Sequence, residues 1–333
     1  MMLHLKRTIA CVVAILGTDN SILATEHFLT TCMGTEFKIL IDHESPAIRK
    51  KGAEEAFKEC KRLNLIFSDY LADSEISRLS ASSFSQEYIE ISQELFDVLR
   101  FSLDLAKRTR GAFDPTLGQL SRTWRIARFR KVLPSSEKLK SALSLSGYEY
   151  LSIKERHSQA KIAKKGIILD LGGIAKGFAA DQMMLKMKEL GIDRCLIDAG
   201  GDLTIGEPPV GKSGWKINIG SDENSPFPSL HLSNCSVATS GDLEQFVEFE
   251  GKRYSHILDS KTGLGLQNQT QVTIVAERGM IADAFATAAI SMGPDKTYEQ
   301  LIKGTNNKAF FLEGDSRKPR TIKLFDPHFN LDK

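Results

Sequence analysis

The sequence lacks three features that would each identify a class of protein: an excess of one charge, a long apolar run, and closely spaced cysteines. Its 333 residues carry 44 Lys and Arg against 42 Asp and Glu, for a formal net charge of +2, and 41% are hydrophobic. This composition excludes a disordered polyelectrolyte, a collagen-like fibre and a polytopic membrane protein. Because there is no basic excess, we expect no nucleic acid as the main partner.

The cysteines are few and scattered. None belongs to a CxxC pair or has a histidine nearby at ligand spacing; the five are Cys11, Cys32, Cys60, Cys195 and Cys235. This spacing argues against a disulfide scaffold and against a zinc site. Cys60 and Cys195 lie in apolar patterns, so we predict that both are small core residues.

The start of the chain has the layout of an export signal. Lys6 and Arg7 precede the apolar run Ile9–Leu16, which is too short to span a bilayer, and small Ala24 stands at a suitable cleavage point. From the residues alone, a buried N-terminal strand is the alternative.

We therefore expect residues 1–24 to be a signal or leader segment, and the length of the rest permits one large domain or two. The mature protein is then expected in the periplasm or at the outer face of the inner membrane. Cys11 weakly resembles a lipid-attachment site, which would anchor the protein to the membrane through its leader.

In the first half of the chain, periodicity and capping residues predict one strand, at Thr35–Ile41, and three helices. The first helix opens at Ser45 and Pro46, and its apolar stripe is Ala53, Phe57, Cys60, Leu63 and Phe67. The other two are predicted from Ser135 or Ser136, and from about Ser92 with Leu95, Val98, Leu99, Leu103 and Ala106 inward.

After Gly166 the pattern changes to short strands separated by turns, with two helices among them. The predicted helices are Ile281–Met292 and Ile174–Leu190, with Gly191 as the C′ residue. The predicted strands are Ile167–Asp170, Arg194–Asp198, Trp215–Ile219, Phe246–Phe249, Tyr254–Leu258 and Val272–Ala276, with two more near Ala309–Leu312 and Thr321–Phe325. Without regular βαβ alternation, this pattern predicts an α+β fold of mixed, largely antiparallel sheets flanked by helices.

Glycine is concentrated in one part of the chain. Eleven of the 25 glycines lie in residues 166–220, where average usage of about 7% would place roughly four. There, Leu169–Gly177 leads through Gly172 and Gly173 into a helix N-terminus, whose free N–H groups and dipole attract anions. Lys176 could reach the same anion. The segment is neither a P-loop nor a dinucleotide fingerprint, and a tight turn into a packed helix explains the spacing equally well.

Asp283 and Thr287 lie four residues apart in a predicted helix, so their oxygens share one side of it. A carboxylate and a hydroxyl placed in this way suit a hard cation such as Mg²⁺. The simpler explanation is an Asp that interacts with the helix dipole and a Thr that bonds to its own helix, and spacing alone favours it.

His256 stands in the predicted strand that leads into the turn Asp259–Gly263. Its ordinary pKa permits a general base, although a lone histidine is more often structural. Two polar loops, Gly111–Thr116 and Ala238–Asp242, are predicted either to contact a ligand or to cap neighbouring elements.

Taken together and in order, these segments resemble the ApbE-type FAD:protein FMN transferases. The resemblance covers about Met33 to Gly293 and implies a T-fold-like arrangement, with residues 25–333 as the transferase domain. Its motifs are Cys32–Thr35, Phe67–Tyr70, Asp73–Leu79, Gly111–Thr116, Asp170–Gly177, Asp198–Asp202, Ala238–Asp242, His256–Gly263 and Ala282–Gly293.

The resemblance also implies a set of site residues. A Mg²⁺ ion would be held by the backbone carbonyl of Gly173 and the side chains of Asp283 and Thr287, which reverses the preference that spacing alone gave. Position 286 is Ala where some members carry a second Asp, so the metal would have one carboxylate fewer. The substrate FAD would be contacted by Met33, Tyr70, Ala112, Phe113, Asp114, Asp170, Lys176 and Leu258.

The implied reaction is a metal-assisted phosphoryl transfer in which FAD is cleaved, FMN is attached to a threonine of an acceptor flavoprotein, and AMP leaves. His256 resembles the base that takes the threonine proton, while Ser260 replaces the proline that is usual in this motif. The implied acceptors are membrane electron-transfer subunits with a short Thr-containing motif. Two alternatives use the same motifs: a Mg-dependent FAD pyrophosphatase and a non-enzymatic periplasmic flavin-binding protein.

Overall fold

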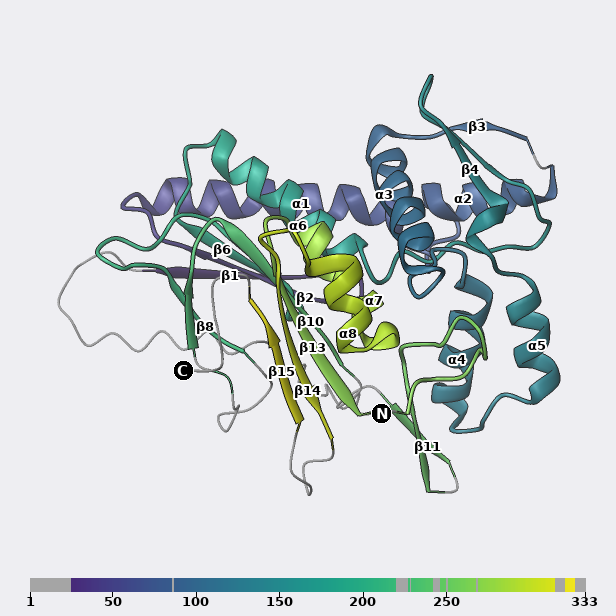
Figure 1. Cartoon of the computed structure of the whole chain (residues 1–333). Coiled ribbons are helices and arrows are strands. Elements are labelled where there is room, and N and C mark those ends of the chain that lie inside the picture. Colours follow the sequence, from purple (N-terminus) through teal and green to yellow (C-terminus); the bar gives the residue numbers. More distant parts are fainter. Residues whose placement is uncertain are drawn as a thin grey trace.

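An eight-stranded antiparallel sheet runs through the computed structural model (Figure 1). The structure describes residues 25–85, 87–219, 227, 229–241, 246–249, 251–267, 269–314 and 321–326. In spatial order the strands are β1 (Glu26–Cys32), β2 (Thr35–Ile41), β6 (Cys195–Ala199), β7 (Leu203–Ile205), β10 (Cys235–Gly241), β13 (Thr270–Ala276), β14 (Lys308–Glu313) and β15 (Thr321–Phe325). The predicted α+β class with largely antiparallel sheets is confirmed.

Helices and three small sheets surround this large sheet. The helices are α1 (Pro46–Phe67), α2 (Glu75–Ala81), α3 (Gln93–Thr109), α4 (Gly118–Arg130), α5 (Ser136–Ser144), α6 (Ala175–Glu189), α7 (Gly279–Met292) and α8 (Pro294–Thr297). The small sheets pair β5 (Gln159–Ile162) with β3 (Ile89–Glu90) and β4 (Leu151–Lys154), β8 (Trp215–Asn218) with β9 (Ser229–Leu232), and β11 (Phe246–Phe249) with β12 (Lys252–Ser255).

Serine caps begin three of the helices where the sequence predicts them. The hydroxyl oxygens of Ser45, Ser92 and Ser135 accept hydrogen bonds from N–H groups in the first turns of α1, α3 and α5. Such a cap satisfies a backbone donor that otherwise has no partner within the helix. The predicted inward stripes of α1 and α3 are also confirmed, because their residues are buried or pack against the main core.

Both faces of the large sheet are buried, and alternation along its strands divides the core in two. In β2, Phe37, Ile39 and Ile41 face the helices, whereas Leu40 faces the other side. The second face is covered by the β8–β9 hairpin, which contributes Trp215. Since a strand places successive side chains on opposite faces, this double burial explains the continuous apolar runs in the sequence.

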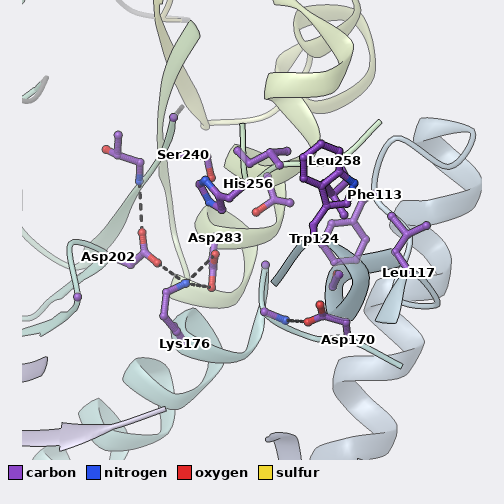
Figure 2. Close-up of a pocket in the computed structure, with 18 of the residues that line it drawn as sticks. Phe113, Leu117, Trp124, Asp170, Lys176, Asp202, Ser240, His256, Leu258 and Asp283 are labelled. Atoms are coloured by element: carbon purple, nitrogen blue, oxygen red, sulfur yellow. Dashed lines mark hydrogen bonds and ion pairs between the residues drawn. The ribbon is translucent and has the colours of Figure 1, made fainter. Parts of the chain in front are cut away.

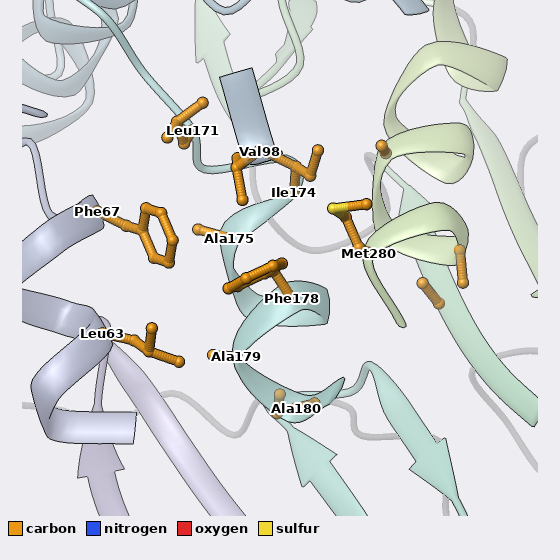
Figure 3. Close-up of a cluster of buried hydrophobic side chains, with 14 of the residues drawn as sticks. Leu63, Phe67, Val98, Leu171, Ile174, Ala175, Phe178, Ala179, Ala180 and Met280 are labelled. Atoms are coloured by element: carbon orange, nitrogen blue, oxygen red, sulfur yellow. The ribbon is translucent and has the colours of Figure 1, made fainter. Parts of the chain in front are cut away.

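The helix layer consists of α1, α6 and α7, and α6 lies in the middle. Figure 3 shows the side chains of α6 between those of α1 and α7. Phe178 of α6 meets Phe67 of α1 edge to face, with ring centroids 5.4 Å apart, and Met280 of α7 belongs to the same buried cluster.

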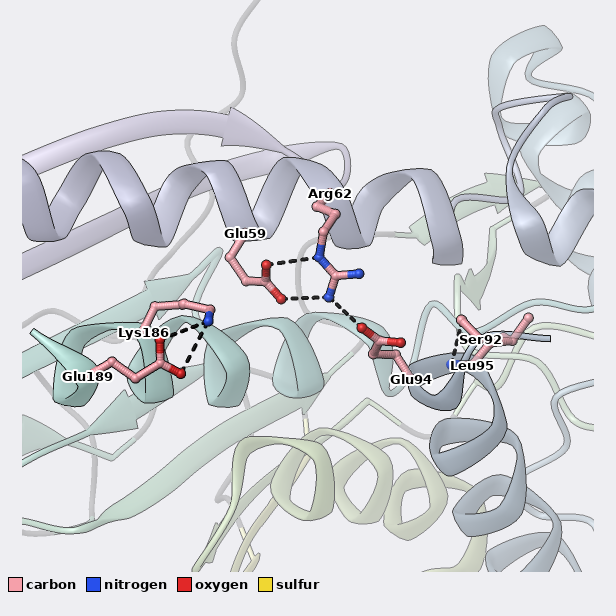
Figure 4. A network of polar contacts seen from close by, with 7 residues as sticks. All are labelled: Glu59, Arg62, Ser92, Glu94, Leu95, Lys186 and Glu189. Atoms are coloured by element: carbon pink, nitrogen blue, oxygen red, sulfur yellow. Dashed lines mark hydrogen bonds and ion pairs between the residues drawn. The ribbon is translucent and has the colours of Figure 1, made fainter. Parts of the chain in front are cut away.

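At the surface, Arg62 of α1 forms ion pairs with Glu59 of the same helix at 2.8 Å and with Glu94 of α3 at 2.6 Å (Figure 4).

A separate apolar cluster attaches α4 and α5 to the β11–β12 hairpin. Leu120 and Trp124 of α4 pack with Leu139 of α5 and Tyr254 of β12. The indole N–H of Trp124 donates to the carbonyl of Gly263 at 2.8 Å. This bond fixes the loop that follows β12 against α4.

Three predicted boundaries are wrong. Ile167–Asp170 is not a strand, because only Ile168 forms a bridge, to Leu117, and its buried apolar residues pack against helices instead. Ala238–Gly241 is not a loop but part of β10, where the hydroxyl oxygens of Thr239 and Thr273 of β13 lie 2.9 Å apart; Asp242 lies outside the described residues.

The third correction concerns the predicted strand Tyr254–Leu258. The strand ends at Ser255, whose hydroxyl accepts a hydrogen bond from the backbone N–H of Ile257 at 3.0 Å and so turns the chain. His256 therefore lies in a bend after the strand rather than within it.

Two further findings concern the membrane and the thiols. Within the described ranges, no helix combines the length and apolar character needed to cross a bilayer. Cys60 and Cys195 are fully buried, as predicted, and both carry free thiols. The predicted leader, residues 1–24, and its Cys11 lie outside the described residues.

Because α6 and α7 lie in close contact, we expect one methyl group added at Gly177 to destabilise the fold strongly. A Cβ at Gly177 would overlap the backbone carbonyl of Gly279 and lie 2.9 Å from the Cβ of Asp283. We expect Gly177→Ala to lower the free energy of unfolding by about 2 kcal/mol or more, as overpacking does. Denaturant unfolding followed by circular dichroism measures it.

Gly52→Ala is the matched control, because Gly52 also lies within a helix but its added methyl group meets mainly the flexible tip of Ile192. There the higher helix propensity of alanine, worth about 1 kcal/mol, offsets the crowding. An equal fall in the free energy of unfolding in Gly177→Ala and Gly52→Ala would contradict a special role for the backbone contact between Gly177 and Gly279.

Candidate active site

A cavity of about 430 Å³ lies where the N-terminal turns of α6 and α7 meet α4, β10 and the loop after β12 (Figure 2). Eleven of the twelve residues that the sequence singled out line it. They are Tyr70, Ala112, Phe113, Asp114, Asp170, Gly173, Lys176, His256, Leu258, Asp283 and Thr287. Segments far apart in the sequence therefore meet in one space.

Lys176 lies at the base of the cavity between two carboxylates. Its ammonium nitrogen is 2.9 Å from Asp202 Oδ2 and 3.3 Å from Asp283 Oδ2. Burial alone would lower the pKa of Lys176, but the two carboxylates outweigh it and raise the pKa, so the lysine stays charged. Burial also raises the pKa of Asp283, to about 6, against the opposing effect of Lys176.

Backbone N–H groups hold both carboxylates in place. The N–H of Gly177 donates to Asp283 Oδ2 at 3.1 Å, and the N–H of Thr239 donates to Asp202 Oδ1 at 3.3 Å. The side chain of Asp283 thus reaches from α7 to the first turn of α6, where the helix dipole favours a negative charge. The positions of the charged groups are set by the backbone of two helices and a strand.

Hard oxygen donors gather beside this cluster. Gly173 approaches Thr287 so closely that an added Cβ would lie 2.7 Å from the threonine hydroxyl oxygen. The carbonyl of Gly173, this hydroxyl and the Asp283 carboxylate are ligand types that Mg²⁺ prefers, so the residues present fit such an ion. In the described part of the chain, no three His, Cys, Asp or Glu side chains cluster as metal ligands.

Arg125 of α4 joins three groups on the opposite wall. Its guanidinium pairs with Asp69 at 2.5 Å and with Asp170 at 3.3 Å, and its central carbon lies 4.1 Å from the centre of the Tyr70 ring. Burial raises the pKa of Asp69 in spite of Arg125. Asp170 also accepts a hydrogen bond from the N–H of Gly172 at 2.8 Å. Arg125 therefore positions two predicted ligand contacts.

The carboxylate of Asp114 accepts hydrogen bonds from two nearby segments of the chain. One of its carboxylate oxygens accepts bonds from the N–H and hydroxyl of Thr116 at 2.8 and 2.6 Å, and the other accepts from the N–H of Tyr148 at 3.2 Å. Burial raises its pKa, although these bonds oppose the shift. Asp114 thereby fixes the loop that brings Ala112 and Phe113 to the cavity wall.

His256 and Leu258 reach the cavity from the loop that Trp124 holds. Within this loop the Asp259 N–H donates to the carbonyl of Leu264 at 2.8 Å, and the Gly263 N–H donates to the carbonyl of Asp259 at 2.8 Å. The turn is closed by backbone bonds, so it forms with Ser260 in the position of the usual proline.

Met33 is the one predicted contact that does not line the cavity. It lies in the turn between β1 and β2 with a positive φ of 49° and packs against the main core. Sequence reasoning also missed residues that do line it, above all Ser121, Trp124, Arg125 and Arg128 on one side of α4. Their spacing of three and four residues was the available signal.

The chain is similar to known proteins of one family. The model of the ApbE family matches residues 33–311. An FAD:protein FMN transferase of Treponema pallidum is 28% identical over 90% of this chain and 90% of its own length. One of Haemophilus influenzae is 30% identical over 84% of each chain. The apo structure of the Pseudomonas stutzeri flavinyl transferase ApbE superposes with a TM-score of 0.77 at 25% identity, covering 93% of this chain and 96% of that one.

The buried carboxylate of Asp198, just before the turn Gly200–Gly201, predicts that the stability of the fold depends on pH. Burial raises the pKa of Asp198 to about 6, aided by the charge of Asp202 and opposed by the hydrogen bond from the Gly201 N–H. Between pH 4 and 6 the folded protein therefore binds more protons than the unfolded chain, so stability falls as pH rises. A shift of about two units corresponds to roughly 3 kcal/mol.

Asp198→Asn keeps an acceptor for the Gly201 N–H and removes the charge. We expect this variant to be roughly 3 kcal/mol more stable than the natural chain at pH 7, with the difference shrinking towards pH 4. Urea unfolding at several pH values measures it. Asp193→Asn, at an exposed position nearby, is the control. A pH-independent difference for Asp198→Asn would contradict the assignment.

Proposed function

The chain belongs to the ApbE family, and from this premise we propose that it is an FAD:protein FMN transferase. It cleaves FAD at the pyrophosphate, joins FMN to the hydroxyl of an acceptor protein and releases AMP. The observation that carries this proposal is the convergence in one cavity of a half-buried cation, Lys176, a group of hard oxygen donors, and His256.

Different residues of the cavity bind FAD and assist the transfer of its FMN part. Lys176 neutralises charge on the pyrophosphate, and the wall that carries Tyr70, Phe113 and Leu258 receives the flavin. His256 takes the proton of the acceptor threonine as its oxygen bonds to the phosphorus of FMN. The bond from that phosphorus to the bridging oxygen breaks, and AMP leaves with this oxygen.

Mg²⁺ would be held by the carbonyl of Gly173 and the side chains of Asp283 and Thr287. When bound, it supplies positive charge that stabilises the phosphoryl transfer. Asp202 already pairs with Lys176 at 2.9 Å, so Asp283 can bind a cation without leaving the half-buried lysine unpaired. The residue at 286 is a fully buried alanine and adds no ligand.

We further propose that the protein acts outside the cytoplasm, on membrane electron-transfer subunits that carry a Thr-containing motif. The support is the export-like order of Lys6, Arg7 and the apolar run Ile9–Leu16. Intact mass of the mature protein, purified from the cell envelope, shows whether residues 1–24 are removed or Cys11 is retained and carries a lipid.

Incubation with FAD, Mg²⁺ and candidate acceptor flavoproteins tests the reaction. Mass spectrometry should find FMN on an acceptor threonine together with an equal amount of AMP, and EDTA should stop both. AMP without acceptor modification would instead favour an FAD pyrophosphatase. FAD binding without any AMP would favour a flavin-binding protein.

Asp283→Asn keeps the side-chain size but removes the charge that would hold the metal. We expect both AMP release and FMN transfer to fall at least about 100-fold, as when a group that stabilises charge in the transition state is removed. Asp193→Asn should leave both rates unchanged. Full activity of Asp283→Asn, or activity in excess EDTA, would refute the metal site.

Arg125 provides a second test, based on affinity. Arg125→Met removes the partner of Asp69 and Asp170 and frees Tyr70, so we expect the dissociation constant for FAD to rise about tenfold, or 1.4 kcal/mol. Flavin fluorescence measures it. Arg130→Met, on the same helix with its side chain exposed, should bind FAD normally. Unchanged affinity in Arg125→Met would remove Arg125 from the site.

A further inference from the structure

Helix α4 exposes apolar side chains beside the residues that line the cavity. Ile126 is 55% exposed, Val132 just after the helix is 61% exposed, and Phe129 is 89% exposed. Because residues three and four apart are neighbours on a helix, Phe129 adjoins both Arg125 and Ile126. Large apolar side chains that stand this far into solvent mark an interaction site when they are grouped.

This apolar group continues across Arg125 to the mouth of the cavity. Arg125 lies over the ring of Tyr70, and Tyr70 is 74% exposed and lines the cavity at the same time. We call Tyr70, Ile126, Phe129 and Val132 the α4 lip. Tyr70 belongs both to the lip and to the cavity wall, whereas Ile126, Phe129 and Val132 are not among the residues that line the cavity.

The charge around the lip has one sign. Residues 115–136 contain five Lys and Arg and no Asp or Glu. Arg125 pairs with the carboxylate of Asp69, and Arg122 donates to the backbone carbonyl of Asp69. Arg128, Arg130 and Lys131 form no ion pair with any described residue. Arg128 also lines the cavity. Basic side chains without counter-ions attract an acidic partner and speed its association.

The identity of the partner rests on the proposed function. A transferase of this kind has a protein as its second substrate, so the chain on either side of the reacting hydroxyl must lie against the mouth. Aromatic, aliphatic and Arg side chains together are typical of the energetic centre of protein interfaces. An anionic bilayer would also attract a basic, apolar helix, but pressed against the lip it would cover the route that the acceptor hydroxyl must take.

We propose that the α4 lip and its basic neighbours dock a segment of the acceptor protein that carries acidic and apolar residues next to the modified hydroxyl. Phe129 and Ile126 receive the apolar residues, and Arg128, Arg130 and Lys131 pair with the acidic ones. The lip thus selects the acceptor, while the cavity binds FAD.

Two labelled peptides test this docking without requiring any chemistry. One has a central threonine flanked by aspartates and leucines, and the other has lysines in place of the aspartates. With the full-length protein and FAD, fluorescence anisotropy should show at least about tenfold tighter binding of the acidic peptide, and high salt should reduce the difference. Equal binding of the two peptides would overturn the proposal.

Matched variants locate the surface. Phe129→Ser combined with Ile126→Ser, and separately Arg130→Glu, should each weaken binding of the acidic peptide at least about tenfold. Leu65→Ser is the apolar control, since Leu65 of α1 is 62% exposed, and Arg156→Glu is the exposed charge control. If a lip variant and its control behave alike, the proposal is wrong.

Three further readouts separate the alternatives. The dissociation constant for FAD should not change in the lip variants, and a change in Arg130→Glu would place this face in the FAD site instead. Flotation with anionic vesicles that depends on Phe129 would overturn the proposal in favour of a membrane surface. A dimer that Phe129→Ser dissolves would overturn it in favour of a second copy of the chain.

Failure of the proposed function has a different signature. If the acidic peptide binds through the lip but neither it nor any flavoprotein acquires FMN, the docking surface stands and the transferase does not. If FMN is transferred to an acceptor at the same kcat/KM by the natural chain and both lip variants, the transferase stands and the docking surface does not.

Discussion

Gly177 and Gly279 let the first turns of α6 and α7 touch backbone to backbone, and two carboxylates tie this contact from opposite sides. Asp181 of α6 accepts N–H bonds from Gly279 and Met280 at 2.6 and 3.0 Å, while Asp283 of α7 accepts one from Gly177 at 3.1 Å. Each helix thus caps the other. The same crossing places the N-terminus of α6 at the cavity and Asp283 beside Lys176, so binding of anions and binding of a cation both depend on it.

The local elements could be predicted because their signals are local. A capping serine or a stripe at helical spacing needs only its own neighbours, and the helices that begin after Ser45, Ser92 and Ser135 followed from such signals. The wrong boundaries are decided by distant contacts. Ile168 meets a single bridge partner rather than a ladder, and Thr239 is polar because its side of β10 faces the cavity and Thr273, not because it lies in a loop.

The candidate site could be located from the sequence but not completed. The Gly-rich turn, Lys176, and the pair Asp283 and Thr287 are visible as short motifs. The wall formed by α4 is not, because Arg125 acquires its role from Asp69, 56 positions away in the chain, and from Asp170, 45 positions away. Met33 matches the motif but does not line the cavity, so its contact with FAD stays a prediction.

The near-neutral net charge of +2 does not reveal that two walls of the cavity carry unlike charge. On one wall, Lys176 is matched by Asp202 and Asp283, so that wall has a carboxylate to offer a cation. On the other, residues 115–136 carry only positive charge, and Asp69 and Asp170 neutralise only part of it. The lysine and carboxylates of the first wall suit a dinucleotide with a bound metal ion, and the positive charge of the second suits an acidic protein segment. The bond from Trp124 to Gly263 fixes the His256 loop to α4. Under the proposed mechanism, the base would therefore move with the wall that is proposed to dock the acceptor, which would link recognition of the acceptor to the placement of its base.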